Sequence, residues 1–323
     1  MAFWGSSRRD NTRGRVSTIT KVRGEIEFID RIRRRVSLPK SMGIVLGIGD
    51  DCAIFRPRGS AEDLLFTTDL LIEEVHFRKD THSAEDVGWK ALARGLSDIA
   101  AMGGVPRFFL VSLALAGWAG PRWIDGFYRG ALLLARRAGV PLVGGDVARS
   151  RHLTCDIVVC GSAPRGTGLR RDRARTGDAI YVSGRLGVSA LGLNRRRGPA
   201  WRRHKRPEPR LALGRFLRER LGATAAMDLS DGLSLDLHRL CLASKKSAAI
   251  QEPPRYPGAT LQQALHGGED YELLFTMPSR TPVPARFEGI PLTRIGVITN
   301  GRPGTVLLDS GPLPLLGWDH LRT

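Results

Sequence analysis

The chain has 323 residues, which exceeds the usual size of one compact domain and predicts two. Hydrophobic residues make up 42% and charged residues 25% of the sequence, values that are typical of a globular protein and exclude a disordered or fibrous one. The formal net charge of +18 is scattered along the chain without a recognisable nucleic-acid-binding motif, so nucleic acid is not an expected partner. A non-catalytic basic protein that binds RNA or DNA remains the alternative of a different class.

The sequence contains none of the features that would place the protein in or across a membrane. No stretch reaches the roughly 18 apolar residues that a spanning helix needs, and the first twenty residues lack the apolar middle of a secretory signal. The four cysteines have neither the paired spacing of a zinc site nor the density of a disulfide framework. These features predict a cytoplasmic protein with reduced cysteines and no membrane partner.

In the first half, short apolar strands alternate with amphipathic helices. Residues 1–23 are polar and basic without apolar periodicity, which predicts a disordered basic extension. Ser83 followed by Asp86 is a capping signature that predicts the start of a helix. Helices are expected at 25–36, from Ser83 to Met102 and at 121–137. Strands are expected at 44–48, 64–68, 108–115, 140–143 and 153–160.

The second half begins after a glycine- and arginine-rich passage at 161–177, and the domain boundary is expected near residue 163. The basic, proline-containing stretch 195–210 is expected to be largely exposed. A helix is expected to begin at Ser230 as its N-cap. Strands are expected at 179–182, 223–227, 273–276, 293–298 and 305–308. Because strands and helices mix without strict alternation, the sequence predicts an α+β fold.

Six aspartates lie at the ends of expected strands, on a helix beside core residues, or at a helix start. They are Asp51, Asp69, Asp98, Asp146, Asp228 and Asp231. Carboxylates that converge on one cleft repel each other unless cations lie between them. Magnesium binds a few carboxylates together with substrate phosphates, so the pattern points to phosphoryl transfer. Each aspartate taken alone has an alternative role as a helix cap or turn residue.

The common nucleotide-binding signatures are absent from the sequence. No G-x-x-x-x-G-K-[ST] loop occurs, and the glycines at 47–49 lack the third glycine of a dinucleotide fingerprint. An ATP site would therefore depend on magnesium, arginines and backbone N–H groups. Gly144 and Gly145 would let the backbone approach a phosphate, and the helix expected at Ser230 would offer free N–H groups. A tight turn is the alternative for the two glycines.

Six segments, in their order and spacing, resemble the thiamine-monophosphate kinase family, which shares a superfamily with aminoimidazole ribonucleotide synthetase. The resemblance runs from about Gly24 to the C-terminus. The segments are Gly47-Ile-Gly-Asp-Asp-Cys-Ala53, Thr67-Thr-Asp69 through Val75-His-Phe77, Leu96-Ser-Asp-Ile-Ala-Ala-Met-Gly103, Gly144-Gly-Asp146, Asp228-Leu-Ser-Asp-Gly232 and Gly267-Gly-Glu-Asp-Tyr-Glu-Leu273.

The resemblance implies a two-domain α+β architecture like that of aminoimidazole ribonucleotide synthetase. An N-terminal α/β sheet domain, 24–163, would bind ATP and magnesium and form a homodimer, and a C-terminal α+β domain, 164–323, would complete the cleft. The implied activity is ATP-dependent phosphorylation of thiamine monophosphate to thiamine diphosphate, by direct in-line transfer assisted by several Mg²⁺ ions, without a covalent enzyme intermediate. The alternative is another ATP-using enzyme of the superfamily with a different small acceptor.

The resemblance also assigns roles to individual residues. The implied magnesium ligands are Asp51, Thr67, Thr68, Asp69, Asp98, Asp146, Asp228 and Asp231. The implied ATP contacts are Gly145, Asp146, Arg171, Ser230 and Tyr128. The implied substrate contacts are His76, Glu269 and an aromatic residue near the C-terminus. Leu315 stands where relatives can carry a stacking tryptophan, so Trp318 is the expected replacement, with a buried anchor for the tail as its alternative. For His76 and Glu269 the alternatives are a structural histidine and a turn or cap residue.

Overall fold

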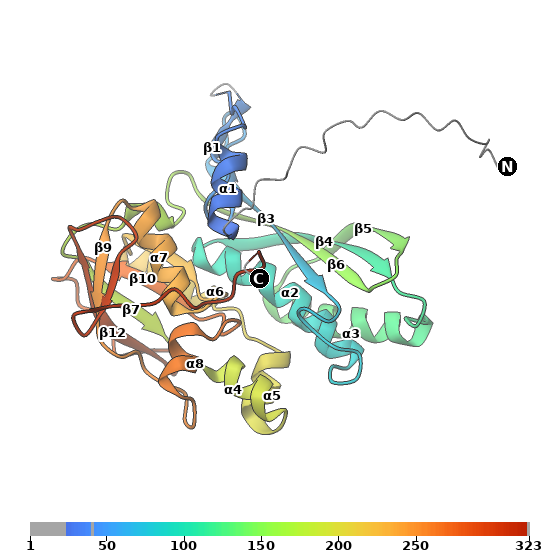
Figure 1. Ribbon diagram of the computed structural model, residues 1–323. Helices are drawn as coiled ribbons and strands as arrows, with labels where there is room; N and C mark the ends of the chain where they lie inside the picture. The colour runs from blue at the N-terminus through green and yellow to red at the C-terminus, as the bar shows by residue number, and fades with distance from the viewer. Residues whose placement is uncertain (1–23, 40–41, 322–323) are drawn as a thin grey trace, which may run out of the picture.

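The computed structural model describes residues 24–39 and 42–321 (Figure 1). The extension expected at 1–23 lies outside the described residues. The chain forms two β-sheets in succession, and the fold is α+β. The first sheet ends at Pro164 and the second begins at Ala179, so the boundary predicted near residue 163 falls at the end of a strand. No described helix has the length and apolar character that crossing a lipid bilayer requires.

The first sheet has, within the described chain, six strands in the order β1-β2-β3-β6-β4-β5. Strand β3 pairs with β6 in antiparallel orientation along its whole length, and β4 pairs with β5 in parallel. Helix α2 packs against β3 and β6, and α3 packs against α2, so both lie on one side of the sheet (Figure 1). The elements are α1 (Glu25–Arg33), β1 (Ile44–Leu46), β2 (Ala53–Phe55), β3 (Glu62–Ile72), α2 (Ala84–Ala101), β4 (Val105–Leu115), α3 (Pro121–Ala138), β5 (Leu142–Arg149) and β6 (Thr154–Pro164).

Helix α2 is the central helix of the molecule, and most of its residues are buried. Ser83 and Asp86 form the predicted capping box at its start. Two glycines let α2 and α3 approach closely: an added Cβ on Gly88 would lie 1.9 Å from the carbonyl oxygen of Phe127, and one on Gly130 would lie 2.0 Å from that of Glu85. This close packing fixes α2 between the first sheet and the second half of the chain.

The second sheet has the described strand order β14-β13-β9-β12-β7-β10-β8, with β11 paired to β12. A hydrophobic core between this sheet and α7 includes Val182, Met227, Leu237 and Leu274. The elements are η2 (Arg171–Arg173), β7 (Ala179–Ser183), α4 (Val188–Arg195), α5 (Gly198–Lys205), α6 (Leu211–Phe216), η3 (Leu217–Leu221), β8 (Ala225–Asp228), α7 (Leu233–Ala243), β9 (Ser247–Ile250), α8 (Leu261–His266), β10 (Leu273–Met277), β11 (Arg286–Phe287), β12 (Ile290–Thr299), β13 (Val306–Leu308) and β14 (Gly311–Pro312).

The stretch 195–210, expected to be largely exposed, instead contains helix α5. Ala200 and His204 on this helix are buried, and only part of its surface carries the basic side chains. Helix α5 packs tightly on α4, because an added Cβ on Gly192 would lie 2.3 Å from the carbonyl oxygen of Ala200. The prediction of an exposed stretch was wrong, because a sequence so rich in arginine gave no indication of a short helix with a narrow buried side.

Three other element predictions differ from the structure. Strand β3 extends to Ile72, so Asp69 lies within the strand and not after it. Strand β5 likewise includes Gly144, Gly145 and Asp146, which were expected to follow a strand. Helix α7 begins at Leu233 with Gly232 as its N-cap, and not at Ser230.

The late start of α7 has a local cause in the side chain of Asp236. The Oδ2 atom of Asp236 accepts hydrogen bonds of 3.0 Å from the backbone N–H groups of Asp231 and Gly232. These N–H groups, expected to be free for a phosphate, are therefore bound by a side chain of the same helix. The residues from Leu229 to Gly232 form a loop that precedes the helix.

Candidate active site

Three aspartates from distant parts of the chain meet at the junction of its two halves. Asp51 lies in the loop between β1 and β2, Asp98 lies on α2, and Asp228 ends β8. One carboxylate oxygen of each lies within 4.8 Å of the others, and no other described group of this kind occurs in the chain. These three residues, here called the carboxylate triad, were all expected from the sequence to converge.

Burial raises the pKa of all three carboxyl groups of the triad. The pKa of Asp228 is raised to about 7, by burial first and then by the charge of Asp51. Burial and the charges of Asp228, Asp69 and Asp51 hold the pKa of Asp98 well above its ordinary value. The pKa of Asp51 is also raised by burial, although Arg171 opposes the shift. Three buried carboxyl groups this close are costly to ionise together.

The triad fits a divalent cation. Its ligand atoms are carboxylate oxygens, which Mg²⁺ prefers, and a cation would offset their repulsion. One of them, Oδ2 of Asp51, is buried and has no hydrogen-bond partner in the structure. An unpaired buried carboxylate oxygen is expensive without a ligand, so this atom is the observation that favours a metal.

Neighbouring side chains fix the orientation of each carboxylate in the triad. Ser97 Oγ donates a 2.6 Å hydrogen bond to Asp228, and Thr67 Oγ1 donates one of 2.5 Å to Asp98. The guanidinium of Arg171 on η2 donates to Asp51 and lies 3.3 Å from Asp50. Asp50 was not predicted as a site residue, yet its pKa is raised to about 7, chiefly by burial.

Asp69 lies beside the triad in an ion pair that the sequence analysis missed. Arg94 on α2 donates two hydrogen bonds to its carboxylate, of 2.8 and 2.5 Å. The charge of Asp69 contributes to the raised pKa of Asp98. The i, i+4 spacing of Arg94 and Asp98 on α2 would have indicated a pair within the helix and not the pair with Asp69 on β3.

Thr68 and Asp146 lie apart from the triad. Alternation along β3 points Thr68 to the opposite face of the sheet from Thr67 and Asp69, and Thr68 Oγ1 donates a 2.6 Å hydrogen bond to Asp156 there. Asp156 is aligned with Ser112 on β4, which is aligned with Asp146 on the edge strand β5. Asp146 is exposed, and Asp156 was not predicted as a site residue.

Asp231 also lies close to the triad without joining it. Its carboxylate forms an ion pair with Arg239 on α7. Arg239 also lies 3.2 Å from Asp236 and 3.1 Å from Glu25 on α1. The charge of Asp231 nevertheless contributes to the raised pKa of Asp228.

The residues expected to bind ATP are spread over several elements. Arg171 contacts the triad directly, and Ser230 follows Asp228 by two residues in the loop before α7. An added Cβ on Gly145 would lie 1.8 Å from the carbonyl oxygen of Val111, so this glycine permits the close approach of β5 to β4. Tyr128 lies on α3, partly buried against the first hydrophobic core.

The residues expected to bind the second substrate gather around Lys90 on α2. Lys90 is completely buried, and its Nζ donates hydrogen bonds to the carbonyl oxygen of His76, at 3.0 Å, and to Glu269 Oε2, at 2.9 Å. We call His76, Lys90 and Glu269 the Lys90 cluster. Lys90 itself was not predicted from the sequence.

The end of the chain reaches this cluster. The ring centroid of His320 lies 5.2 Å from that of His76, and Trp318 contacts His320 edge-on with centroids 5.6 Å apart. The backbone N–H of Trp318 donates to the carbonyl oxygen of Asp231, at 2.9 Å. The Trp318 residue is 54% exposed, so it is not the buried anchor that was its alternative role.

The charge states within the Lys90 cluster follow from its burial. His76 Nδ1 accepts a hydrogen bond from the N–H of Ile72, and burial and Arg94 lower the pKa of His76 to about 3. His76 is therefore neutral, with its proton on Nε2, which is buried and without a partner. Burial alone would raise the pKa of Glu269, but other contributions, of which the charge of Lys90 is the largest, outweigh it and hold that pKa at about 2.

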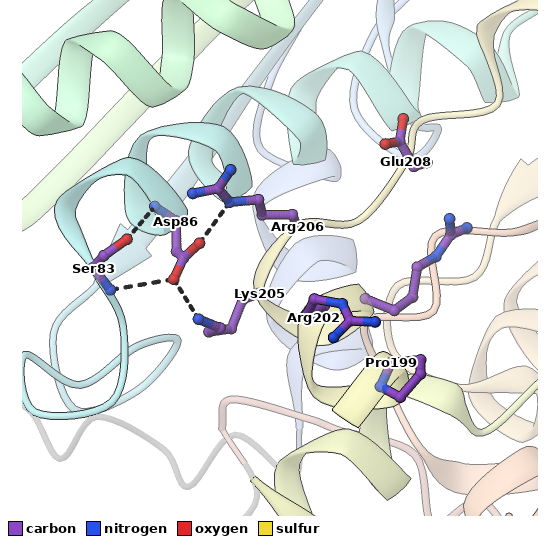
Figure 2. Close-up of a pocket in the computed structure, with 8 residues that line it drawn as sticks. Ser83, Asp86, Pro199, Arg202, Lys205, Arg206 and Glu208 are labelled. Carbon is purple, nitrogen blue, oxygen red and sulfur yellow. Dashed lines mark hydrogen bonds and ion pairs between the residues drawn. The ribbon is translucent and has the colours of Figure 1, made fainter. Parts of the chain in front are cut away.

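A cavity of about 650 Å³ lies at the N-terminal end of α2, between this helix and α5. Figure 2 shows Asp86 in this cavity with Lys205 and Arg206 pointing toward its carboxylate. Both pairs are 2.5 Å long, and they join the first half of the chain to the second. The cavity lies one helical turn from Lys90.

One side of α2 therefore carries the polar groups that line the junction of the two halves. The side chains that reach across it or toward β3 are Asp86, Lys90, Arg94, Ser97 and Asp98. Asp86, Lys90, Arg94 and Asp98 follow one another at intervals of four residues, which places them on one side of the helix, and Ser97 lies next to Asp98. The Lys90 cluster and the triad are thus separate parts of one continuous site.

Comparisons with known proteins place this site in context. Residues 49–163 match the family described as AIR synthase related protein, N-terminal domain. The chain is 32% identical over 327 residues to thiamine-monophosphate kinase of Bacillus subtilis (strain 168), covering 92% of this chain and 99% of that protein. It is 36% identical over 328 residues to thiamine-monophosphate kinase of Escherichia coli (strain K12), covering 93% and 99%.

A solved structure described as "AaThiL complexed with AMPPCP and TMP" is similar over most of both chains. Its TM-score is 0.81 and its sequence identity 31%, and the match covers 92% of this chain and 97% of that one. The similarity therefore includes both sheets and the junction between them.

Proposed function

The chain belongs to the thiamine-monophosphate kinase family, and on this premise we propose that it transfers the terminal phosphoryl group of ATP to thiamine monophosphate, forming thiamine diphosphate. The observation that carries the proposal is the buried triad of Asp51, Asp98 and Asp228, with its unpartnered carboxylate oxygen. A kinase needs such a site, because the two substrates it brings together are both anions. The relative solved with AMPPCP, an analogue of ATP, supports ATP as the phosphoryl donor.

We assign Mg²⁺ to the triad, with Asp69 beside it. When bound there, Mg²⁺ would supply neutralisation of the phosphate charges. Thr67, held against Asp98, and Asp231, held by Arg239, are proposed to complete the ligand set near the triad. Thr68 lies on the other face of the sheet, and Asp146 lies at its edge. If several Mg²⁺ ions bind, these two residues would be ligands of an ion apart from the triad.

The proposed transfer is direct and in-line, without a covalent enzyme intermediate. An oxygen of the acceptor phosphate is already ionised and needs no strong general base to attack the γ-phosphorus. The contribution of the protein is positioning and charge compensation, for which Arg171 lies against the triad. Gly145, Ser230 and Tyr128 are proposed as further ATP contacts on the family resemblance alone.

The Lys90 cluster is the proposed acceptor site. Glu269 is ionised, which suits the positively charged thiazolium ring of thiamine, and His76 presents an unpaired N–H that suits an acceptor atom. Trp318 supplies an exposed aromatic surface next to the cluster, which suits stacking on a flat ring.

We also propose that the protein is a homodimer that associates through the first sheet. The face of this sheet opposite α2 exposes Leu70, and the edge strand β5 exposes Val143 and Val147, at 51%, 57% and 65%. Large apolar side chains on an open face and at an unpaired edge favour burial against a second copy. We further propose that the two domains meet at about residue 163.

We also propose a cytoplasmic location, which the four free, buried cysteines support.

The test is product analysis with the purified full-length chain, ATP, Mg²⁺ and thiamine monophosphate. We expect thiamine diphosphate and ADP in equal amounts, and neither product from the Asp98→Asn variant. Aminoimidazole-pathway substrates, offered in place of thiamine monophosphate, serve as control acceptors. Consumption of ATP with one of these acceptors and not with thiamine monophosphate would show that the chain is a different enzyme of the superfamily.

A further inference from the structure

Lys90 occupies a position that simple packing does not explain. Its side chain is completely buried, and burying an ammonium group is costly unless it is paired. The charge is compensated by Glu269, 179 residues away in the chain, and by the backbone carbonyl of His76. An apolar residue of similar size would fill the same space without the desolvation cost, so stability alone does not account for a lysine here.

The partners of Lys90 are themselves constrained. Glu269 has a φ of 65°, in the left-handed region that residues other than glycine rarely adopt, and its N–H donates to the carbonyl oxygen of Ser230 at 2.7 Å. Strained backbone that persists in a structure is typical of functional sites. The His76 carbonyl belongs to the segment between β3 and α2, so Lys90 joins one strained residue of the second half to a loop of the first.

Lys90 also lies at a defined place on α2. Arg94, one turn further along the helix, holds Asp69, and Asp98 after another turn belongs to the triad. The rise of an α-helix places Lys90 about 12 Å along the axis from Asp98. This separation suits a molecule whose phosphate lies near the triad and whose ring system lies near Glu269.

We propose that Lys90 is a positioning residue for the acceptor. Its ammonium group fixes the Glu269 carboxylate and the His76 backbone. These two residues, from different halves of the chain, therefore present one surface to the cationic ring of the acceptor. This proposal rests on the proposed function and adds a residue to it. Lys90 does not touch the acceptor in this arrangement. It acts through Glu269, and its removal should therefore weaken acceptor binding without a matching effect on ATP.

The titration behaviour of Glu269 agrees with this role. Burial pushes its pKa upward, and the charge of Lys90 is the largest opposing contribution. Without Lys90, Glu269 would bind a proton more readily and lose the charge that attracts a cation. The other titratable or charged groups that face Glu269 are Arg94 on α2, His76 and His82 before it, His204 on α5 and Tyr271.

The experiment compares Lys90→Met, Glu269→Gln and the double variant, all in the full-length enzyme. We expect Lys90→Met to raise the KM for thiamine monophosphate by about tenfold or more, with little change in the KM for ATP. The double variant should have the KM of Glu269→Gln alone, because Lys90 acts only through that carboxylate. The matched control is Lys205→Met, which removes another lysine that pairs with a carboxylate on α2 and should leave the KM within about twofold.

The pH dependence of the KM distinguishes a positioning role of Lys90 from a purely structural one, because a purely structural lysine would not change it. For the wild type, the KM for thiamine monophosphate should show no contribution from Glu269 between pH 5.5 and 8, because that carboxylate stays ionised. In Lys90→Met the pKa of Glu269 should be higher, because its largest lowering contribution is gone, so the KM should depend on pH and fall as Glu269 loses its proton. Calorimetric titration of thiamine monophosphate into each variant, without ATP, should reproduce the same order of affinities.

Two outcomes would overturn the role of Lys90. One is a double variant whose KM rises by the product of the two single effects, and the other is a Lys90→Met enzyme with unchanged KM and pH profile. If Lys90→Met does not fold, the double variant takes its place, because it leaves neither Lys90 nor Glu269 as an uncompensated buried charge. A double variant with the wild-type KM for thiamine monophosphate would then overturn the role of Lys90. Absence of thiamine diphosphate formation by the wild type would instead refute the proposed function, and the role of Lys90 with it.

Discussion

Ser97 on α2 donates a 2.6 Å hydrogen bond to the carboxylate of Asp228 at the end of β8, 131 residues away in the chain. This bond lies at the triad and joins the first half of the molecule to the second. The carboxylate that it orients is buried and its pKa is raised to about 7. The proposed metal site therefore forms only when the two halves pack against each other, and the following predictions separate the contributions of packing and of metal binding.

Asp228→Asn should reduce turnover by at least about a hundredfold and leave the metal-free fold at least as stable as the wild type. The amide can still accept the hydrogen bond from Ser97, and the change removes one of three mutually repelling charges. Turnover assays and thermal melts in EDTA would measure the two effects. As a control, Glu62→Gln removes a partly exposed carboxylate that pairs with Arg107 at the start of β3, and should change neither quantity. Wild-type turnover by Asp228→Asn would remove this residue from the proposed metal site.

Stabilisation of the protein by Mg²⁺ should increase with pH. A carboxyl group whose pKa is raised on folding binds more protons in the folded state, so its contribution to metal-free stability falls as pH rises from about 4 toward 7. Protons compete with the metal for Asp228 at the acidic end of this range. The increase in Tm on adding Mg²⁺ should be larger at pH 8 than at pH 5.5. Equal increases at both pH values would show that the cation binds elsewhere.

Two buried histidines should make the fold sensitive to acid. Burial first, and then the charge of Lys90, lowers the pKa of His82 to about 4 and that of His204 to about 3. The unfolded chain binds protons at these residues below about pH 6.5 while the folded chain does not, so stability is complete above that pH and is lost as the pH falls. Each residue can contribute a slope of up to about 1.4 kcal/mol per pH unit in this window.

Urea unfolding at pH 7.5 and 5.0 would measure this loss. The difference in unfolding free energy between the two pH values should shrink in His204→Gln, since glutamine takes up no proton. The exposed residue His152 offers the matched control, and His152→Gln should keep the wild-type difference. An unchanged difference in His204→Gln would mean that this histidine is protonated in the folded protein.

Two adjacent glycines in β5 should respond differently to alanine. A Cβ on Gly145 would lie 1.8 Å from the carbonyl oxygen of Val111, whereas the nearest atom to a Cβ on Gly144 is a Leu110 methyl at 3.7 Å. Gly145→Ala should therefore lower the free energy of unfolding by about 1–3 kcal/mol or more, because β5 must move away from β4. Gly144→Ala should change it by less than about 1 kcal/mol. Urea denaturation of both variants measures the contrast, and equal effects would contradict the close approach.

The sequence was sufficient for the parts of the site that depend on local pattern. Asp51, Asp98 and Asp228 were expected to converge because they lie at the ends of strands or on a helix beside core residues, and the structure brings them together. The capping box at Ser83 and Asp86 was also correct. The place of each aspartate in its own element depends on residues that are near it in the chain, and hydrophobic periodicity reveals that element.

Other features could not be read in this way, because they arise from tertiary contact. Lys90 looked like one polar residue of an amphipathic helix, and its role emerges only when Glu269 folds against it. The glycines at 144 and 145 were taken to follow a strand, whereas at Gly145 the actual constraint is the distance to a neighbouring strand. Adjacent residues of a strand point to opposite faces, so Thr67 and Thr68 could not both lie on the side of the triad, but which of the two does so is set by the way the sheet packs.

The course of the last described residues has a practical consequence for handling the protein. The carboxylate of Asp319 accepts a hydrogen bond from the N–H of Glu25 at the start of α1, while Trp318 and His320 lie next to the Lys90 cluster. A purification handle placed close behind His320 would lie near this cluster. Recombinant versions intended for kinetics should therefore carry a purification handle at the amino end, or have a carboxyl-terminal one cleaved before measurement.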